Sequence, residues 1–244
     1  MTGSGRGVMS SAEGQHEIRL VQWNVMWGTR DKLERWKTVV DDIAARQPDI
    51  VVLSEGPSEP FRNTLLERLG PGWRAAVSKN SIQTPGYWYN MAICSRWPVR
   101  ALEARAISTG RILRARIDAP GGPIHLLEVD GMSDPRWPRR TRLEDVARVV
   151  NEQQQRGDPI DIIAGDFNTV SRSVGFEAIR SAGSGYTRAS DRTGWRGTWP
   201  SVCPLYDIDH VLVDARWEVA RCEMISNRYL DHRAQLVVLK RPVR

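Results

Sequence analysis

The chain has 244 residues, 41% of them hydrophobic, and its 35 Lys and Arg outnumber its 29 Asp and Glu to give a formal charge of +6. This length supports a substantial core, and no apolar run approaches the roughly 20 residues that a membrane-spanning helix needs. Three cysteines without paired spacing argue against a disulfide framework, which predicts a reducing, cytoplasmic location.

The first 16 residues are polar and rich in Gly and Ser, without the apolar centre of a signal peptide. We expect a disordered leader over 1–16 and a single domain over 17–244. Within the domain, short β-branched runs between turn residues predict strands, and apolar residues at helical spacing predict helices. In chain order we expect a strand at 17–23, a helix at 32–46, a strand at 49–54, a helix at 61–69, strands at 73–78, 88–95, 98–106, 110–118 and 122–130, a helix at 139–156, a strand at 160–165, a helix at 176–182, and strands at 208–214, 216–225 and 234–240.

Both buried strands and amphipathic helices occur throughout the chain, which predicts the α/β class. Two stacked mixed β-sheets flanked by helices, a four-layer sandwich, would bury the strands on both faces and the apolar sides of the helices.

Polar side chains of one chemical kind stand at the borders of five predicted strands. The buried run 160–165 leads into Asp166 and Asn168, which point the same way because they are two residues apart on an extended segment. The other borders carry Asn24, Glu55, Asp209, Asp231 and His232. Each residue alone also has an ordinary interpretation, as a turn or cap residue or as a solvated charge. Their recurrence favours a shared site.

A pocket that gathers several carboxylates needs a neutralising partner. Two carboxylates about 4 Å apart repel by roughly 4 kcal/mol at an effective dielectric of about 20. Oxygen ligands suit Mg²⁺ or Mn²⁺ better than zinc, and the sequence has no Cys/His cluster with zinc spacing. The pattern therefore predicts a hard divalent cation.

In this order and spacing, the segments resemble the endonuclease/exonuclease/phosphatase superfamily of metal-dependent, DNase I-like phosphoesterases. The matching segments are 22–24 (Gln-Trp-Asn), 53–55 (Leu-Ser-Glu), 165–168 (Gly-Asp-Phe-Asn), 197–200 (Gly-Thr-Trp-Pro), 208–211 (Ile-Asp-His-Val) and 231–232 (Asp-His). The resemblance extends from about residue 18 to 240 and implies a DNase I-like sandwich that hydrolyses phosphate esters.

The resemblance also implies a role for each residue. Glu55 would be the principal metal ligand, supported by Asn24 and Asp231. Asp166 would polarise the attacking water, and Asn168 would orient that water or a phosphoryl oxygen. His232 would donate to the phosphoryl oxygens or shuttle a proton, and Asp209 would hold its ring in one tautomer. His210 is expected to be structural.

Asp130 departs from the family pattern, in which a Thr-His or a Tyr ends the corresponding strand. It acts either as an extra metal ligand or protonated acid in catalysis, or Asp130-Gly131 is a tight turn, for which Asp-Gly is a strong signal. The loss of the family's hydrogen-bond donor at this position leaves open how the leaving group is protonated, and with it an impaired or specialised enzyme.

Two arginine-rich loops with tryptophans follow the motifs, and arginine beside exposed aromatic rings is typical of single-stranded nucleic-acid binding. One comprises residues 135–142, with Arg136, Trp137, Arg139, Arg140 and Arg142; the other, at 185–200, contains Trp195. Trp27 and Trp88 are further candidates for the rim. We therefore expect a nucleic-acid or nucleotide substrate and no obligate protein partner. The alternatives are an enzyme for a small-molecule or lipid-headgroup phosphate ester, and a phosphate-binding module with weakened chemistry.

Overall fold

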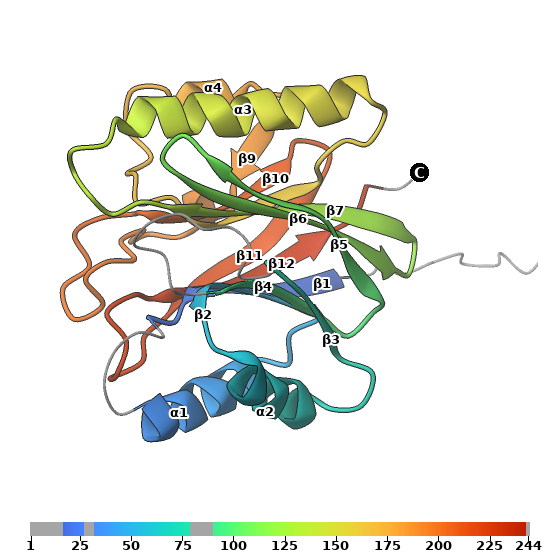
Figure 1. The fold of residues 1–244 in the computed structure, drawn as a ribbon, viewed down its shortest axis with the longest axis vertical. Helices are drawn as coiled ribbons and strands as arrows, with labels where there is room; N and C mark the ends of the chain where they lie inside the picture. Colours follow the sequence, from blue (N-terminus) through green and yellow to red (C-terminus); the bar gives the residue numbers. More distant parts are fainter. Residues whose placement is uncertain (1–16, 27–31, 79–89, 243–244) are drawn as a thin grey trace, which may run out of the picture.

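Two six-stranded β-sheets lie face to face, with helices on both outer sides, in the computed structural model of the chain (Figure 1). The structure describes residues 17–26, 32–78 and 90–242. This architecture confirms the predicted four-layer sandwich. The leader, Trp27 and Trp88 lie outside the described residues.

The first sheet has the strand order β11-β12-β1-β2-β4-β3 and is covered by two helices. Its elements are β1 (Glu17–Asn24), β2 (Ile50–Gly56), β3 (Arg74–Val77), β4 (Asn90–Ser95), β11 (Glu218–Ile225), β12 (Ala234–Lys240), α1 (Lys32–Ala45) and α2 (Glu59–Leu69).

The second sheet has the order β5-β6-β7-β8-β10-β9. Its elements are β5 (Val99–Ile107), β6 (Gly110–Ala119), β7 (Gly122–Gly131), β8 (Ile162–Asp166), β9 (Tyr186–Arg188), β10 (Asp209–Asp214), the outer helices α3 (Arg139–Gln155) and α4 (Phe176–Arg180), and the 3₁₀ turn η1 (Ala189–Arg192). None of the helices within the described ranges is long and apolar enough to cross a bilayer.

Strand periodicity builds the core. Ile18 and Leu20 of β1 face the other sheet, whereas Val21 and Trp23 face α1 and α2. Since successive side chains alternate across a strand, a central strand covered on both faces becomes apolar on both. This explains the nearly continuous apolar runs in the sequence.

Each sheet contains one parallel pair among antiparallel neighbours, β1 with β2 and β7 with β8. Parallel strands end at the same edge, so the last residues of these four strands lie together. β10 runs antiparallel to β8, with Asp209 opposite Asp166, and β12 runs antiparallel to β1. The beginnings of β10 and β12 therefore meet the same edge.

Candidate active site at the shared edge of the two sheets

The predicted site residues meet at this edge, and hydrogen bonds join the two sheets there. The Nδ2 atom of Asn24, at the end of β1, donates to Glu55 Oε1 at 3.1 Å and to Asp166 Oδ2 at 2.9 Å. The backbone N–H of Asp166 donates to Ser54 Oγ at 3.2 Å. The edge thus presents two carboxylates bridged by one amide.

The backbone at this edge adopts conformations that require explanation. Glu55 and Asn168 have φ angles of +47° and +45°, in the left-handed region that residues other than glycine seldom occupy. Gly165 precedes Asp166, and a Cβ atom there would lie 2.0 Å from the carbonyl oxygen of Val129. Only glycine fits this position, which brings Asp166 close to β7.

Asn168 closes the turn after β8. Its backbone N–H donates to Asp166 Oδ1 at 2.7 Å, and its Nδ2 atom donates to Gly131 O at 2.8 Å and to Asp166 Oδ2 at 3.1 Å. These bonds fix the Asp166 carboxylate.

His232 and Asp209 form a buried pair. The Nδ1 atom of His232 lies 2.8 Å from Asp209 Oδ2, while its Nε2 atom lies 4.0 Å from Asp166 Oδ2. Gln22 Nε2 donates to the other Asp209 oxygen at 3.3 Å, and Gln235 Nε2 donates to the Asp209 carbonyl at 2.7 Å. Because Asp209 accepts from Nδ1–H, Nε2 of the imidazole is directed toward Asp166.

The electrostatics of the edge follow from burial and from neighbouring charge. Burial raises the pKa of Glu55, and Asp130 and Asp231 raise it further although the Asn24 amide opposes them. Burial and then the Asp209 carboxylate raise the pKa of Asp166 to about 8. Burial disfavours the charged imidazolium of His232, but the surrounding carboxylates, Asp209 foremost, raise its pKa to about 10. His232 is therefore cationic at neutral pH.

The donors fit a hard divalent cation. Glu55, Asn24 and Asp231 supply carboxylate and amide oxygens. Asp231 Oδ1 is buried and has no hydrogen-bond partner in the part of the chain that the structure describes, although Oδ2 accepts from the Trp199 indole at 3.2 Å. Oxygen atoms with unused lone pairs among mutually repelling carboxylates are what Mg²⁺ or Mn²⁺ satisfies. Asp166, Asp209 and His232 also cluster closely enough to coordinate a metal, but the His232–Asp209 bond already engages one ligand atom of each.

Asp130 lies inside β7, opposite Asp166 of β8 and Arg111 of β6. The tight-turn interpretation of Asp130-Gly131 is wrong, because both residues belong to β7: Asp130 pairs with Arg111 and Asp166 on its two sides, and Gly131 pairs with Gly110 of β6. Burial raises the pKa of Asp130, while the ion-paired guanidinium of Arg111 opposes that shift.

Arg111, the buried ionic partner of Asp130, is not among the predicted site residues. The signal was present: Arg111 lies on the same face of its strand as Leu113, Ala115 and Ile117, which face the other sheet. A charge in register with that apolar face indicates a buried ionic partner.

Three exposed or half-buried arginines of the loop 135–142 already bond to groups of residues 133–144. Arg136 pairs with Asp134, Arg140 pairs with Glu144, and Arg139 donates to the backbone carbonyls of its own loop. Trp137 is exposed beside them. A substrate-binding role for these four residues stays a prediction.

The predicted phosphate-binding role of Arg142 is wrong, because its side chain is fully buried. It donates to the carbonyls of Thr109, Met132 and Phe167 and so joins β6, β7 and the turn that carries Asn168. His210 is structural, as expected: it packs on Phe167 and Phe176, and its Nε2 atom lies 2.8 Å from the carbonyl of Thr169.

Known proteins share this fold. The chain superposes on humanized TDP2 of D. rerio with a TM-score of 0.70 at 19% identity, covering 92% of this chain and 99% of that one. The human Nocturnin catalytic domain with bound sulfate gives a TM-score of 0.71 at 17% identity, covering 92% and 93%. An endonuclease/exonuclease/phosphatase family protein from Bacteroides thetaiotaomicron gives 0.70 at 15% identity, covering 93% and 99%. These likenesses show the DNase I-like fold.

No curated protein sequence matches the chain significantly. A family model does: the model of the endonuclease/exonuclease/phosphatase family matches residues 21–228. That match extends from within β1 to just before Asp231 and covers most of the chain. The chain therefore belongs to the endonuclease/exonuclease/phosphatase family.

Proposed function

We propose that the chain is a divalent-metal-dependent phosphodiesterase that acts on nucleic acid or nucleotides. The observation that carries the proposal is the convergence of Asn24, Glu55 and Asp166 with the His232–Asp209 pair at one edge. Members of its family are phosphoric ester hydrolases, and this edge contains the groups that such hydrolysis requires.

Glu55, Asn24 and Asp231 would hold Mg²⁺ or Mn²⁺. When bound, the cation would polarise a phosphoryl oxygen and offset the negative charge that develops on the leaving oxygen. The protein contributes the ligands in a rigid arrangement, because the Asn24 amide is fixed by bonds to both carboxylates.

Asp166 would accept a proton from the attacking water. Its raised pKa suits a general base near neutral pH, because proton acceptance is most efficient when the pKa of the base lies near the working pH. Asn168 would orient the water, since its backbone and side chain already bond the Asp166 carboxylate.

His232 would donate from Nε2–H to a phosphoryl oxygen. Asp209 holds the proton on Nδ1 and stabilises the imidazolium, which leaves Nε2–H directed toward the substrate. By the family resemblance, Asp130 stands where many relatives carry a Thr-His or a Tyr. Because Asp130 is ion-paired with Arg111 of the neighbouring strand, we propose that this ion pair modulates protonation of the leaving group.

Nucleic acid is the substrate class that the neighbours and the charge support best. A structure of D. rerio TDP2 contains a single-strand DNA product, and the Nocturnin domain contains a sulfate anion. The chain itself carries a net charge of +6. A basic surface attracts polyanions independently of sequence.

The test is a panel of plasmid DNA, oligonucleotides, RNA, nucleotides and small phosphate esters, each assayed with Mg²⁺, with Mn²⁺ and with EDTA. We expect cleavage of a phosphodiester that EDTA abolishes, and a fall in turnover of at least about 100-fold in Asp166→Asn with an unchanged circular-dichroism spectrum. Turnover only of compact esters would favour the small-molecule alternative. Tight binding without product under either metal would favour the binding module. Full activity of Asp166→Asn would contradict the assignment of Asp166 as the general base.

All three cysteines are free, which supports a reducing compartment and hence a cytoplasmic location. Fractionation of producing cells that recovers the protein outside the cytoplasm would overturn this part of the proposal.

A further inference from the structure

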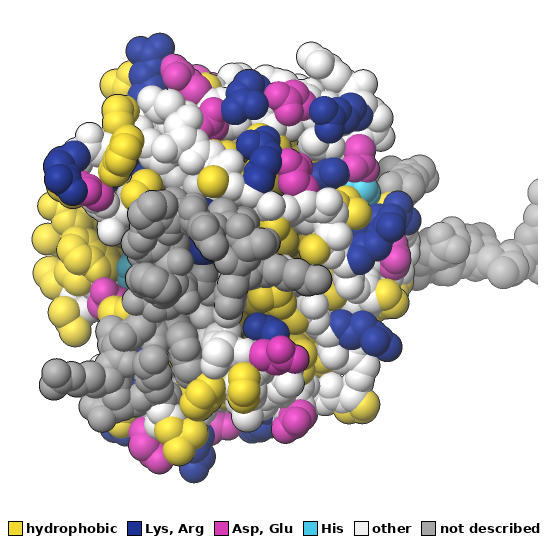
Figure 2. All heavy atoms as spheres, viewed as in Figure 1, with side chains coloured by type: hydrophobic (Ala, Val, Ile, Leu, Met, Phe, Trp, Pro, Cys, Tyr) yellow, Lys and Arg dark blue, Asp and Glu magenta, His cyan; other side chains and the backbone are white. Residues whose placement is uncertain are grey.

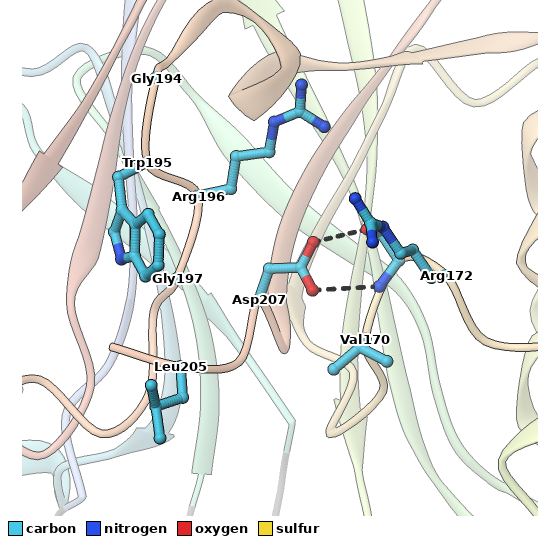
Figure 3. A pocket seen from close by; sticks show the side chains of 9 residues that line it. Val170, Arg172, Gly194, Trp195, Arg196, Gly197, Leu205 and Asp207 are labelled. Atoms are coloured by element: carbon cyan, nitrogen blue, oxygen red, sulfur yellow. Dashed lines mark hydrogen bonds between the residues drawn. The ribbon is translucent and has the colours of Figure 1, made fainter. Parts of the chain in front are cut away.

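A pocket of about 600 Å³ lies beside the candidate active site, between the segment after Asn168 and the loop 193–207. Figure 3 shows side chains from both segments converging on it. The lining combines guanidinium groups with apolar surface: Val170, Arg172, Trp195, Arg196, Leu205 and Asp207. This volume falls in the range of small-ligand sites.

Both walls of the pocket are anchored in the candidate active site. Arg172 follows Asn168 by four residues, so their Cα atoms lie at most about 14 Å apart. Arg196 precedes Trp199 by three residues, and the Trp199 indole donates to Asp231. A ligand in the pocket therefore lies within one or two nucleotide lengths of the carboxylates.

The charge of the pocket favours an anion. Arg172 is exposed and makes no ion pair with any residue that the structure describes. Asp207 is already neutralised, because Arg188 Nη1 lies 2.6 Å from its Oδ2 atom. An adjoining hollow of about 340 Å³ shares Arg172 and Arg196 and adds Arg180, Arg188 and Asp191. Asp191 pairs with both Arg188 and Arg196, so four guanidinium groups face one carboxylate there and positive charge is in excess.

The aromatic side of the pocket is rigid and exposed. Trp195 is 61% exposed, and its indole N–H donates to Pro204 O at 2.8 Å. That bond fixes the orientation of the ring while its faces remain available. Figure 2 shows hydrophobic side chains gathered at the edge of the molecule where Figure 1 places this loop; Trp195, Val202 and Leu205 are among its exposed residues. Exposed apolar surface of this kind marks a binding region.

We infer that this pocket binds one nucleotide of a single-stranded nucleic acid, next to the phosphodiester that is cleaved. Arg172 and Arg196 contact the phosphate and Trp195 stacks on the base, because guanidinium groups match phosphate oxygens and an aromatic face stacks on any unpaired base. The inference rests on the proposed phosphodiesterase function. It adds that the substrate is single-stranded and that the strand reaches the candidate active site through this pocket.

The test measures binding of a short fluorescein-labelled single-stranded oligodeoxynucleotide of mixed sequence by fluorescence anisotropy, in EDTA, between about 50 and 200 mM salt. Arg172→Ala should weaken binding and reduce the slope of log affinity against log salt by about 0.7, the value for one single-strand phosphate contact. Trp195→Ala should weaken binding about 5- to 100-fold with the slope unchanged. Arg172→Lys should restore the slope, and Trp195→Phe should restore most of the affinity.

The matched control is Arg100→Ala. Arg100 is an exposed arginine on β5, at the opposite edge of the sheet from β9 and η1, and its loss should leave binding unchanged. A blunt duplex of the same sequence should bind at least about 10-fold more weakly than the single strand, because its bases are already stacked. Thermal unfolding of each variant confirms that it is folded.

Wild-type affinity in both Arg172→Ala and Trp195→Ala would overturn the inference, as would equal affinity for the duplex. Loss of binding to phosphatidylserine vesicles in these variants, with oligonucleotide binding intact, would assign the pocket to a lipid surface instead. The assay needs no hydrolysis. If no member of the substrate panel is cleaved, the proposed function fails. The binding measurement still shows whether the pocket binds single-stranded nucleic acid.

Discussion

The charge on His232 depends on Asp209, so Asp209→Asn should move the titration of this histidine to much lower pH. Two unit charges 2.8 Å apart attract by about 6 kcal/mol at an effective dielectric of 20. A change of about 1.4 kcal/mol corresponds to a tenfold change in proton affinity. Loss of that attraction should lower the pKa of His232 from about 10 toward its ordinary value of about 6.5, since burial is then opposed only by the more distant carboxylates Asp166 and Asp231.

The chain has four histidines, so their imidazole signals can be followed individually by NMR between about pH 5 and 10.5, with His232→Ala to assign the signal. At pH 8 a group with a pKa of about 6.5 is only about 3% protonated, so activity that requires the imidazolium should fall at least about 30-fold. Asp118→Asn, which removes an exposed carboxylate paired with Arg116, should change neither result. A His232 signal that titrates at the same pH in wild type and Asp209→Asn would show that Asp209 does not set the charge on His232.

Three further outcomes follow from buried charge. Mg²⁺ should raise the melting temperature, and more at pH 8.5 than at pH 6. The raised pKa of the proposed ligand Glu55 makes protonation compete with the cation, and the neighbouring Asp166, with a pKa of about 8, adds its negative charge only at the higher pH; a shift independent of pH would contradict this. Glu128 is fully buried, neither carboxylate oxygen makes a regular hydrogen bond to any described residue, and burial raises its pKa. The wild type therefore loses stability as pH rises above about 4.5, where the unfolded chain ionises. In urea unfolding at pH 7, the free energy of unfolding of Glu128→Leu should exceed that of the wild type by about 1–3 kcal/mol. An equal or lower value would show that the buried Glu128 carboxyl does not destabilise the fold. Arg142→Ala should cost about 3–5 kcal/mol in the same assay, since it leaves an arginine-sized cavity and several buried carbonyls unpaired, whereas Arg140→Ala, at an exposed pair, should change stability by less than about 1 kcal/mol.

The layers, and the gathering of polar side chains at strand ends, were predictable from the sequence because both depend on simple periodicities. Apolar runs of strand length, such as 160–165, can only be buried between layers, and a polar residue directly after such a run must emerge at a sheet edge. The meeting of Asn24, Glu55 and Asp166 follows from that rule once β1 and β2, and β7 and β8, are parallel. The choice of which strands pair, and in which direction, depends on contacts between distant segments, and the spacing of residues along the sequence does not predict it.

The elements that escaped prediction are short or depend on distant partners. β9 has three residues, too few to show a period, and η1 follows it directly. The arginine-rich composition of 135–142 predicts a substrate-binding role for Arg142, and only the carbonyls of three other segments explain its burial. Asp130-Gly131 has the composition of a turn, yet β6 pairs with both residues and β8 pairs with Asp130, so the segment stays extended.

The antiparallel pairing of β1 and β12 sets Glu17 opposite Lys240. β1 has eight residues and carries Asn24 at its other end, so the backbone enters and leaves the sandwich about 25 Å from the catalytic edge. A short linker can therefore connect Lys240 to Glu17, and new ends can be opened at Gly157 between α3 and β8. Such a circular permutant should retain hydrolysis, and the same geometry offers either original end as an attachment point that leaves the substrate path open.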